Sequence, residues 1–410
     1  MKKHSAEDVA RFIIKTLNGA GHTALLAGGC VRDMLMGATP KDFDVATDAR
    51  PHRVVQLFRR TEQVGAKFGV VLVRMWGHQT EVATFRSDGT YTDGRHPDEV
   101  TFGDQIEDAK RRDFTINGMF FDVLAGRVID HVGGQQDLEA RLIRAIGDPY
   151  RRFAEDHLRM LRSVRFAARL GFEIEPQTLA AARKQAHLLP TISQERLREE
   201  LKLILTDATR AAGWRWIRST GLADHLIPGV QFSDQDAKSV ADRLAELPAR
   251  IGFALALAVL LRPRESKHAA SICRAFTCSN DECKAVSWLL THLPRVIEFQ
   301  RLDLADLKLL MDDARFESLC HLLRADLAAS SSPLAAYETL LARTQAIPAD
   351  EVAPPPLVTG HDLLARNVAQ GPRYTEILEA LYRAQLNNKI ISREAALASL
   401  DEMIEEKECS

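Results

Sequence analysis

The chain has 410 residues, which is too many for one compact core, so roughly two to four domains are expected. Hydrophobic residues make up 46% and charged residues 27% of the sequence, a composition typical of globular proteins. The formal net charge of −2 excludes a protein that binds nucleic acid through an overall positive charge.

Residues 1–150 combine the patterns of helices and strands. Residues 6–20 have the apolar spacing of an amphipathic helix. Strands are expected at short apolar or alternating runs bounded by turn residues, namely 24–27, 70–75, 80–85, 119–123 and 127–129. This mixture predicts an α/β domain.

The strongest candidate site begins at the first predicted strand. The motif GGCVRD (residues 28–33) comes directly after that strand and opens a helix. Gly28 and Gly29 let backbone amides approach a triphosphate closely, and Arg32 can neutralise its charge. By itself such a glycine pair is usually only a turn, so the motif gains meaning only in combination with the acidic residues downstream.

Two aspartates lie a short distance downstream, in the motif KDFD (residues 41–44). In a strand, Asp42 and Asp44 point to the same face because side chains alternate with period two. Two carboxylates so placed can hold one or two Mg²⁺ ions, which prefer carboxylates together with substrate phosphates. Glu81, in the strand predicted over 80–85, is either a third carboxylate beside this pair or a solvent-facing strand residue.

A third motif, RRDFTIN (residues 111–117), suits a nucleotide. Its arginines, Arg112 among them, can bind phosphates, while Asp113 and Asn117 can bind ribose hydroxyls. The alternative is a helix start with Asp113 as its cap, and both interpretations can hold at once.

After Asp148-Pro149 the sequence is almost wholly helical. Residues 151–170 predict one long helix that ends at Gly171. A proline-rich connector is expected over 348–356. Further helices are expected over 176–188, 193–205, 212–218, several within 234–347, 373–386 and 392–405.

The fourth motif, EDHLR (residues 155–159), lies in the predicted long helix. There Asp156 and Arg159 are i, i+3 neighbours that can present acceptors and donors to the edge of a base, and Arg162 and Arg165 continue the row. The alternative is an ion pair on an exposed helix face. Residues 151–200 carry ten Lys and Arg against seven Asp and Glu, a local excess that can bind phosphate.

Membrane and metal-cluster signals are weak. The longest apolar run, Ile251 to Leu261, is too short to span a bilayer, and the N-terminus lacks the pattern of a signal peptide, so we expect no membrane and a cytoplasmic location. The gaps between Cys273, Cys278 and Cys283 differ from those of common zinc sites, so reduced thiols are expected.

In their order, GGCVRD, DFD, RRDFTIN and EDHLR resemble the motifs of class II tRNA nucleotidyltransferases and bacterial poly(A) polymerases. The resemblance covers residues 20–205, and the segment PPPLVTGHDLLA is similar to the tail of such enzymes. It implies a polymerase-β-like α/β nucleotidyltransferase head followed by an all-α neck, body and tail. The corresponding ranges are 1–150, 151–230, 231–347 and 348–410.

The resemblance also implies roles for the motif residues. Asp42 and Asp44 would bind Mg²⁺, and Gly29 and Arg32 would contact the triphosphate. Arg112 and Asp113 would serve phosphate and ribose. Asp156 and Arg159 would pair with the incoming base, and Arg162 and Arg165 would also contact the nucleotide.

The function implied is template-independent addition of C, C and A from CTP and ATP to the 3′ end of tRNA, with release of pyrophosphate. A poly(A) polymerase or an enzyme that adds only A is the alternative within the family. The acidic C-terminal end and the segment 65–73 favour CCA addition. From another class, an RNA-binding protein with a decayed site remains open, and loss of metal-dependent incorporation on Asp42→Ala would discriminate.

Two further segments bear on function. Residues 87–102 resemble the flexible loop of the family that is linked to the switch from C to A addition, so deletion of residues 88–98 should abolish the final A and spare both C additions. The doublet His361-Asp362 lacks the further ligands of an HD-type phosphohydrolase and predicts a helix start instead.

Overall fold

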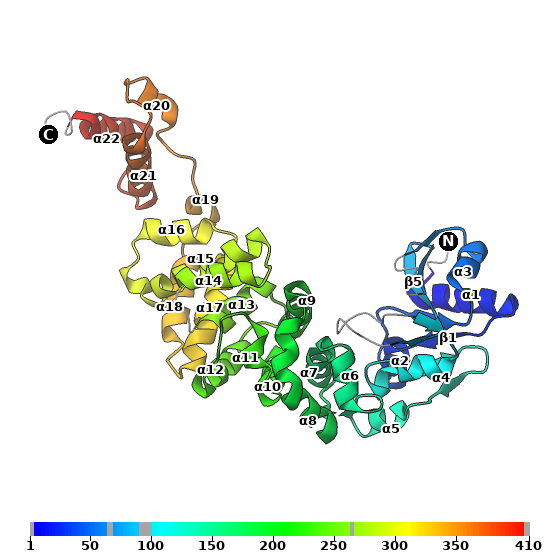
Figure 1. Cartoon of the computed structure of the whole chain (residues 1–410). Coiled ribbons are helices and arrows are strands. Elements are labelled where there is room, and N and C mark those ends of the chain that lie inside the picture. Colours follow the sequence, from blue (N-terminus) through cyan, green and yellow to red (C-terminus); the bar gives the residue numbers. More distant parts are fainter. Residues whose placement is uncertain (1–3, 64–68, 90–99, 263–265, 406–410) are drawn as a thin grey trace. The chain divides into compact units, whose positions relative to one another are not determined.

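The computed structural model describes residues 4–63, 69–89, 100–262 and 266–405. The chain divides into two compact units (Figure 1). One consists of Met1–Ser233 with Ala275–Thr277, and the other of Asp234–Arg274 with Cys278–Ser410. The predicted division into head, neck, body and tail is finer than this and stays a prediction.

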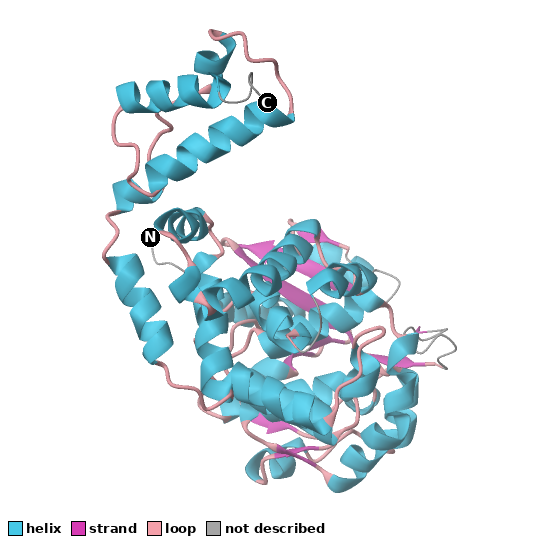
Figure 2. Cartoon of the chain, turned by 90° about the vertical axis from the view of Figure 1, so that its left-hand side faces the viewer, coloured by secondary structure: helices cyan, strands magenta, loops and turns pink. Residues whose placement is uncertain are grey.

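A seven-stranded mixed sheet organises the first unit, with the strand order β3-β4-β5-β2-β1-β8-β9. Only β2 and β5 pair in parallel, and all other neighbours in the sheet are antiparallel. The strands are β1 Ala24–Ala27, β2 Asp44–Thr47, β3 Thr61–Glu62, β4 Val70–Met75, β5 His78–Thr84, β8 Phe120–Asp122 and β9 Arg127–Ile129. Figure 2 shows the strands, in magenta, gathered in this unit.

The two faces of the sheet bury different apolar sets. One face packs Val45, Val71 and Val82 against α1 (Ala6–Gly19) and α3 (Pro51–Leu57). The start of α1 is set by Ser5, whose side chain accepts from the Asp8 amide in a capping box. The other face packs Ala46 and Phe120 against α4 (Gln105–Lys110). Buried side chains alternate along these strands, which fixes the face to which every polar strand residue points.

Most predicted strands of this unit are confirmed. The strand predicted over 80–85 begins earlier, at His78, because the hairpin turn falls on Trp76 and Gly77, which both have positive φ.

The loop resembling the C-to-A switch begins and ends as a two-stranded ribbon, β6 (Arg86–Asp88) with β7 (Val100–Phe102). Its residues 90–99, like residues 64–68 of the segment 65–73, lie outside the described residues.

The single long helix predicted over 151–170 is wrong. The chain forms α6 (Pro149–Glu155) and α7 (Leu158–Leu170), separated at Asp156 by extended backbone with φ −148° and ψ 104°. The Asp156 carboxylate accepts from the Leu158 amide at 3.1 Å, so it satisfies one of the free donors at the start of α7. Gly171 ends α7 in a left-handed conformation, as predicted.

The remaining elements of the first unit are mostly helices. The helix predicted over 193–205 is present, but Ser193 makes no side-chain cap bond. The elements are α2 Gly29–Leu35, η2 Thr115–Asn117, α5 Gly134–Glu139, β10 Leu142–Ile143, β11 Glu173–Ile174, α8 Pro176–Gln185, η3 Ala186–Thr191, α9 Gln194–Leu205, α10 Arg210–Ser219 and α11 Ala223–Leu226.

The second unit is helical throughout its described residues, as predicted. His361-Asp362 lies in α20, where Asp362 completes a capping box with Thr359, so this doublet is a helix start. The helices are α12 Asp234–Ala245, α13 Phe253–Leu261, α14 Ser266–Ala275, α15 Asn280–Ile297, η4 Phe299–Arg301, α16 Leu304–Asp312, α17 Phe316–Ala329, α18 Ala335–Gln345, α19 Ala349–Val352, α20 Gly360–Leu364, α21 Pro372–Leu386 and α22 Arg393–Glu405. Within the described residues, no helix has both the length and the apolar character needed to cross a bilayer.

Candidate active site

A cleft of about 500 Å³ in the first unit brings the sequence motifs together. Its lining contains six arginines and three aspartates, a balance that suits a polyanionic ligand. The lining residues are Gly28, Gly29, Arg32, Asp44, Arg111, Arg112, Asp113, Asn117, Asp156, Leu158, Arg159, Arg162, Phe166 and Arg196. Ten of the thirteen residues predicted from the sequence are among them, and Asp42, Glu81 and Arg165 are not.

Carboxylates gather on one side of the cleft, at the edge of the sheet. Val45 of β2 pairs with Val82 of β5 in parallel register, so the residues that precede them, Asp44 and Glu81, share the opposite face of the sheet. Both are exposed. We call Asp42, Asp44 and Glu81 the strand wall.

Only Asp44 belongs to a strand, so the prediction that Asp42 and Asp44 share one is wrong. The cause is the partner strand, because β1 ends at Ala27, opposite Asp44, and turns into α2, which leaves residue 42 without a ladder. Phe43 is buried between two exposed aspartates, so Asp42 and Asp44 still lie on one side of the chain.

The carboxylates of the strand wall repel one another electrostatically. Although Asp44 is exposed at its surface, the surrounding protein partly desolvates its carboxylate, which raises its pKa. The charges of Glu81 and Asp42 raise the pKa further, whereas Arg112 lowers it, with a result of about 6. Among the described residues, no group of three His, Cys, Asp or Glu side chains is arranged as a complete metal site. The donor set is Asp44, which lines the cleft, with the exposed Asp42 and Glu81 nearby. Such a set suits a hard divalent cation that draws its other ligands from phosphates and water.

The glycine turn lies beside Arg112. Gly28 has φ 76°, and a Cβ on it would come within 2.8 Å of an Arg112 guanidinium nitrogen. Arg112 itself donates to Asp108 at 3.0 Å and to the Asn117 carbonyl at 3.4 Å. The positive φ favours glycine at position 28, and any larger residue there would also displace the Arg112 guanidinium.

Arg32 is more enclosed than its predicted role suggests. It is 3% exposed, and it donates to Asn117 Oδ1 at 2.6 Å and to Asp33 Oδ1 at 2.6 Å. Asn117 in turn donates to Asp113 Oδ1 at 3.2 Å. The first and third motifs are thus joined by side-chain hydrogen bonds at the floor of the cleft.

Asp113 joins the head motifs to helix α7. Its Oδ1 accepts from the Phe114 amide at 2.8 Å, and its Oδ2 accepts from Arg162 at 2.5 Å. The alternative interpretation of Asp113 as a helix cap is wrong, because η2 begins after Phe114 and has no side-chain cap bond. Burial acts to raise the pKa of Asp113, but Arg162 and these hydrogen bonds outweigh it and hold the pKa below its ordinary value. Arg162 therefore balances the charge of Asp113, and Asp113 links the head motifs to α7.

Helix α7 and its neighbours form the opposite side of the cleft. Phe166 lies there with the guanidinium carbons of Arg32, Arg162 and Arg165 at 5.3, 5.4 and 4.4 Å from its ring centre. Arg165 points to Glu200 at 2.5 Å and does not line the cleft, contrary to the predicted row of arginines. We call Asp113, Asp156, Arg159, Arg162, Phe166 and Arg196 the helix wall.

Asp156 and Arg159 were predicted to be neighbours on one helix, but Asp156 lies outside the helix that contains Arg159. The alternative, an ion pair between the two, is also wrong, because each pairs with another residue. Asp156 occupies the break before α7, where its Oδ2 accepts from Arg196 of α9 at 2.8 Å. Arg159 instead donates to Glu155 at 2.6 Å. Both Asp156 and Arg159 nevertheless line the cleft, so the helix wall offers a fixed acceptor and a fixed donor.

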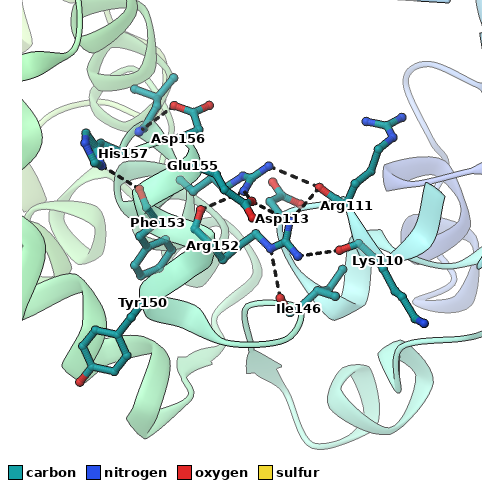
Figure 3. A network of polar contacts seen from close by, with 12 residues as sticks. Lys110, Arg111, Asp113, Ile146, Tyr150, Arg152, Phe153, Glu155, Asp156 and His157 are labelled. Atoms are coloured by element: carbon teal, nitrogen blue, oxygen red, sulfur yellow. Dashed lines mark hydrogen bonds and ion pairs between the residues drawn. The ribbon is translucent and has the colours of Figure 1, made fainter. Parts of the chain in front are cut away.

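Glu155 belongs to a polar network with Arg152, Lys110 and Arg111 (Figure 3), and this network also holds Arg159. Glu155 Oε2 accepts from Arg152 at 2.8 Å and from Arg159 at 2.6 Å. Arg152 also donates to the carbonyl of Lys110 at 2.7 Å, and both arginines donate to the carbonyl of Arg111, at 3.4 and 3.3 Å. The free carbonyls at the end of α4 are thus satisfied by arginines of α6 and α7, which couples the third motif to the fourth.

Four residues that line the cleft were not singled out from the sequence, namely Arg111, Leu158, Phe166 and Arg196. Arg111 is the first residue of the third motif and was passed over in favour of Arg112. Phe166 is four residues beyond Arg162, which is a helical neighbour spacing that could have found it. Arg196 lies 40 residues from its partner Asp156, and nothing local in the sequence indicates the pairing.

Three family models match successive parts of the chain. The head domain of poly(A) polymerase matches residues 24–144, and the probable RNA- and SrmB-binding site of polymerase A matches residues 171–233. A putative domain 2 of tRNA nucleotidyltransferase matches residues 254–400. The matched regions span both units.

Similar proteins cover nearly the whole chain. The CCA-adding enzyme of Lactobacillus johnsonii is 34% identical over 394 residues, 94% of either chain, and that of Geobacillus kaustophilus is 36% identical over 389 residues, 92% of either chain. The crystal structure of the Bacillus stearothermophilus CCA-adding enzyme with CTP is 31% identical, with a TM-score of 0.82 over 100% of this chain and 99% of the other. The Thermotoga maritima CCA-adding enzyme complexed with tRNA, at 20% identity and a TM-score of 0.71, shows the same fold.

Proposed function

This chain belongs to the CCA-adding enzymes, and we propose that its cleft carries out their reaction, the addition of C, C and A from CTP and ATP to the 3′ end of tRNA with release of pyrophosphate. The observation that carries the proposal is the convergence of a carboxylate wall and an arginine-rich wall on one cleft. The relatives that cover almost the whole chain are named CCA-adding enzymes, which favours this reaction over addition of adenylate alone. With tRNA, CTP and ATP as substrates, the protein acts in the cytoplasm.

The strand wall is the proposed place of Mg²⁺. Asp42 and Asp44 would hold the ion, and Glu81 would add negative charge beside it. When bound, Mg²⁺ supplies positive charge to the α-phosphate and to the attacking 3′-hydroxyl. The mutual repulsion that raises the pKa of Asp44 supports this assignment, because a divalent cation relieves it.

The triphosphate is proposed to lie between the strand wall and the glycine turn. Gly28 and Gly29 leave room for phosphate oxygens at the backbone, and Arg112 faces them across the turn. Arg32, which is nearly buried, acts by holding Asn117 in place as well as by its charge. Asp113 and Asn117 are the proposed partners of the ribose.

Base selection is proposed to come from Asp156 and Arg159. Cytosine and adenine both carry an exocyclic amino donor, whereas uracil and guanine carry a carbonyl acceptor at the corresponding edge. An ionised carboxylate accepts hydrogen bonds and cannot donate them, so Asp156 favours the bases that carry an amino group. Arg159 supplies donors for the ring acceptors next to that amino group. Arg196 orients Asp156 by donating a hydrogen bond to its Oδ2 at 2.8 Å.

The test is incubation of the protein with a tRNA that lacks CCA, with CTP, ATP or both, and then sequencing of the 3′ ends. We expect two C residues with CTP alone, and C-C-A and then a stop with both nucleotides. Long A tails on the tRNA and on unrelated RNA would show a poly(A) polymerase instead. No extension under any condition, with Mg²⁺ present, would refute catalysis altogether.

A further inference from the structure

A second pocket, of about 280 Å³, lies in the first unit and has no part in the function proposed above. Its lining comes from three places in the sequence: the loop before β2, the outer face of α7, and the end of α9 with the adjoining turn. The lining residues are Lys41, Arg165, Ala168, Arg169, Leu203, Ile204, Thr206, Asp207 and Thr209. We call it the α7–α9 pocket.

Helix α7 is shared by the cleft and the α7–α9 pocket. Arg162 and Phe166 line the cleft, whereas Arg165 and Arg169 line the pocket. At about 100° per residue, the two pairs lie on neighbouring faces of one helix, roughly 60° apart. At its other end, the pocket is lined by Lys41, the residue directly before Asp42. The pocket therefore adjoins the strand wall from outside the nucleotide cleft.

The charges of the pocket are available to a ligand. Lys41 and Arg169 are exposed, and within the described part of the chain neither forms an ion pair, while Arg165 is bound to Glu200 at 2.5 Å. The carboxylate that lines the pocket, Asp207, already accepts from the Thr209 amide at 2.9 Å and from its hydroxyl at 2.8 Å. Two cations thus face solvent beside a carboxylate that is partly satisfied.

An apolar surface completes the pocket. Leu203 is 54% exposed and lines the pocket, so its side chain can make an apolar contact with a ligand there. Cations next to an exposed apolar side chain suit a ligand that carries both phosphates and flat rings, such as single-stranded nucleic acid.

From this placement we infer that the α7–α9 pocket holds the last nucleotides of the RNA that is extended, with Lys41 and Arg169 on their phosphates and Leu203 against a base or ribose. The inference rests on the proposed function, because the reaction needs a second substrate whose 3′-hydroxyl reaches the strand wall while a nucleoside triphosphate fills the cleft. A pocket that is lined by Lys41, the neighbour of Asp42, and that lies on the face of α7 next to the one lining the cleft meets that need.

The test separates the two substrates kinetically. In Arg169→Ala, the KM for a tRNA ending in CC should rise about fivefold. In Lys41→Ala/Arg169→Ala, it should rise at least about tenfold. In both variants, the KM for ATP should stay within twofold of the wild-type value. The slope of log affinity against log salt for this tRNA should fall by about 0.7 for each phosphate contact removed. Lys15→Ala/Arg127→Ala removes the same charges from exposed positions outside both pockets and should change neither constant.

Unchanged KM values for tRNA in both variants, or a rise in the KM for ATP instead, would overturn the inference. Because Lys41 adjoins Asp42, the single variant Arg169→Ala is the decisive one. A direct measurement keeps the inference separate from the proposed function: tRNA ending in CC, with a photoreactive group on its last nucleotide, should crosslink to residues 203–209 or to Arg169 without any nucleotide present. Crosslinks confined to other regions would contradict the inference even if CCA addition is found.

Discussion

The carboxylates of the strand wall and of the helix wall have opposite electrostatic surroundings. On the strand wall, Asp44 lies near Glu81 and Asp42, and its pKa is raised to about 6 by burial and by these like charges. On the helix wall, Asp113 accepts from Arg162 at 2.5 Å, and Asp156 accepts from Arg196 at 2.8 Å. The pKa of Asp113 is accordingly held below its ordinary value.

This contrast separates carboxylates that lack a positively charged partner among the described residues from carboxylates that are already paired with an arginine. Carboxylates that repel one another gain from a divalent cation, so the strand wall is suited to metal binding and catalysis. Carboxylates paired with arginines have fixed orientations and nearly balanced charge, so the helix wall is suited to recognition. Four predictions test the contrast, beginning with the largest effect.

The largest effect is expected at the strand wall. Asp44→Ala should lower the rate of CMP incorporation by about 10³-fold or more, because several kcal/mol of metal-dependent charge stabilisation would be lost. Without metal, Asp44→Asn should unfold at the same temperature as wild type or higher, because it removes a like charge. Incorporation of labelled CMP and thermal unfolding measure the two effects, and the exposed Glu139→Ala is the control for both.

A neutralised carboxylate should behave in the opposite way. The Asp108 side chain is 1% exposed and pairs with Arg111 at 2.7 Å and with Arg112 at 3.0 Å. Asp108→Asn should therefore lower the free energy of unfolding by about 3 kcal/mol at pH 7, because it breaks buried ion pairs. Chemical denaturation measures this, and a loss below about 1 kcal/mol would contradict the role of the pairs.

The same variant has a defined pH dependence. Burial acts to raise the pKa of Asp108, but Arg112 and Arg111 outweigh it, and the folded-state pKa lies below the ordinary value. The stability it contributes is fully present above the unfolded-state pKa of about 3.9 and is lost as pH falls through the lower folded-state pKa. The difference between wild type and Asp108→Asn should thus be constant at neutral pH and shrink only in strong acid.

On the helix wall, nucleotide selectivity should change while catalysis survives. Asp156→Asn replaces a group that only accepts with one that also donates, so uracil and guanine become acceptable partners. The preference for CTP over UTP should fall by about 10- to 100-fold, which corresponds to the roughly 1–3 kcal/mol of a base contact. Competition between the two nucleotides at the first addition measures this ratio, and an unchanged ratio would remove Asp156 from base selection.

The smallest effect is expected from the network that supports Arg159. Arg152→Ala removes the bonds to Glu155 and to the Lys110 carbonyl, so Arg159 should be less well oriented. The KM for CTP should rise about five- to tenfold while the KM for tRNA stays unchanged, since each lost hydrogen bond is worth about 1 kcal/mol. Arg151→Ala, at the exposed neighbouring position, is the matched control. An equal rise of the KM for CTP in Arg152→Ala and Arg151→Ala would show that the loss of positive charge, and not the loss of the hydrogen bonds to Glu155 and Lys110, causes the effect.

The sequence predicted the strand wall better than the helix wall. The order of strand, glycine turn and helix at residues 24–35 can be read from local patterns, and so can the exposed faces of Asp44 and Glu81. The register that puts those two side by side is a pairing between strands, which local periodicity supports but does not specify.

The helix wall could not be derived in the same way, because its decisive contacts join residues far apart in the chain. The break at Asp156 goes with a bond from Arg196, and the end of α4 is capped by Arg152 and Arg159. A helical pattern over 151–170 contains no sign of either contact. The resemblance of the motif to the family predicted that these residues bind the nucleotide, whereas their partners became visible only in three dimensions.

Metal binding to the strand wall is the most direct test of the contrast between the two walls. Titration of Mn²⁺ in the presence of a non-hydrolysable CTP analogue, monitored by electron paramagnetic resonance, counts the ions bound to wild type and to Asp42→Ala/Asp44→Ala. We predict that the variant binds at least one ion fewer than the wild type, with the analogue still bound to both. Equal numbers of ions on both proteins would contradict the assignment of the strand wall as the metal site.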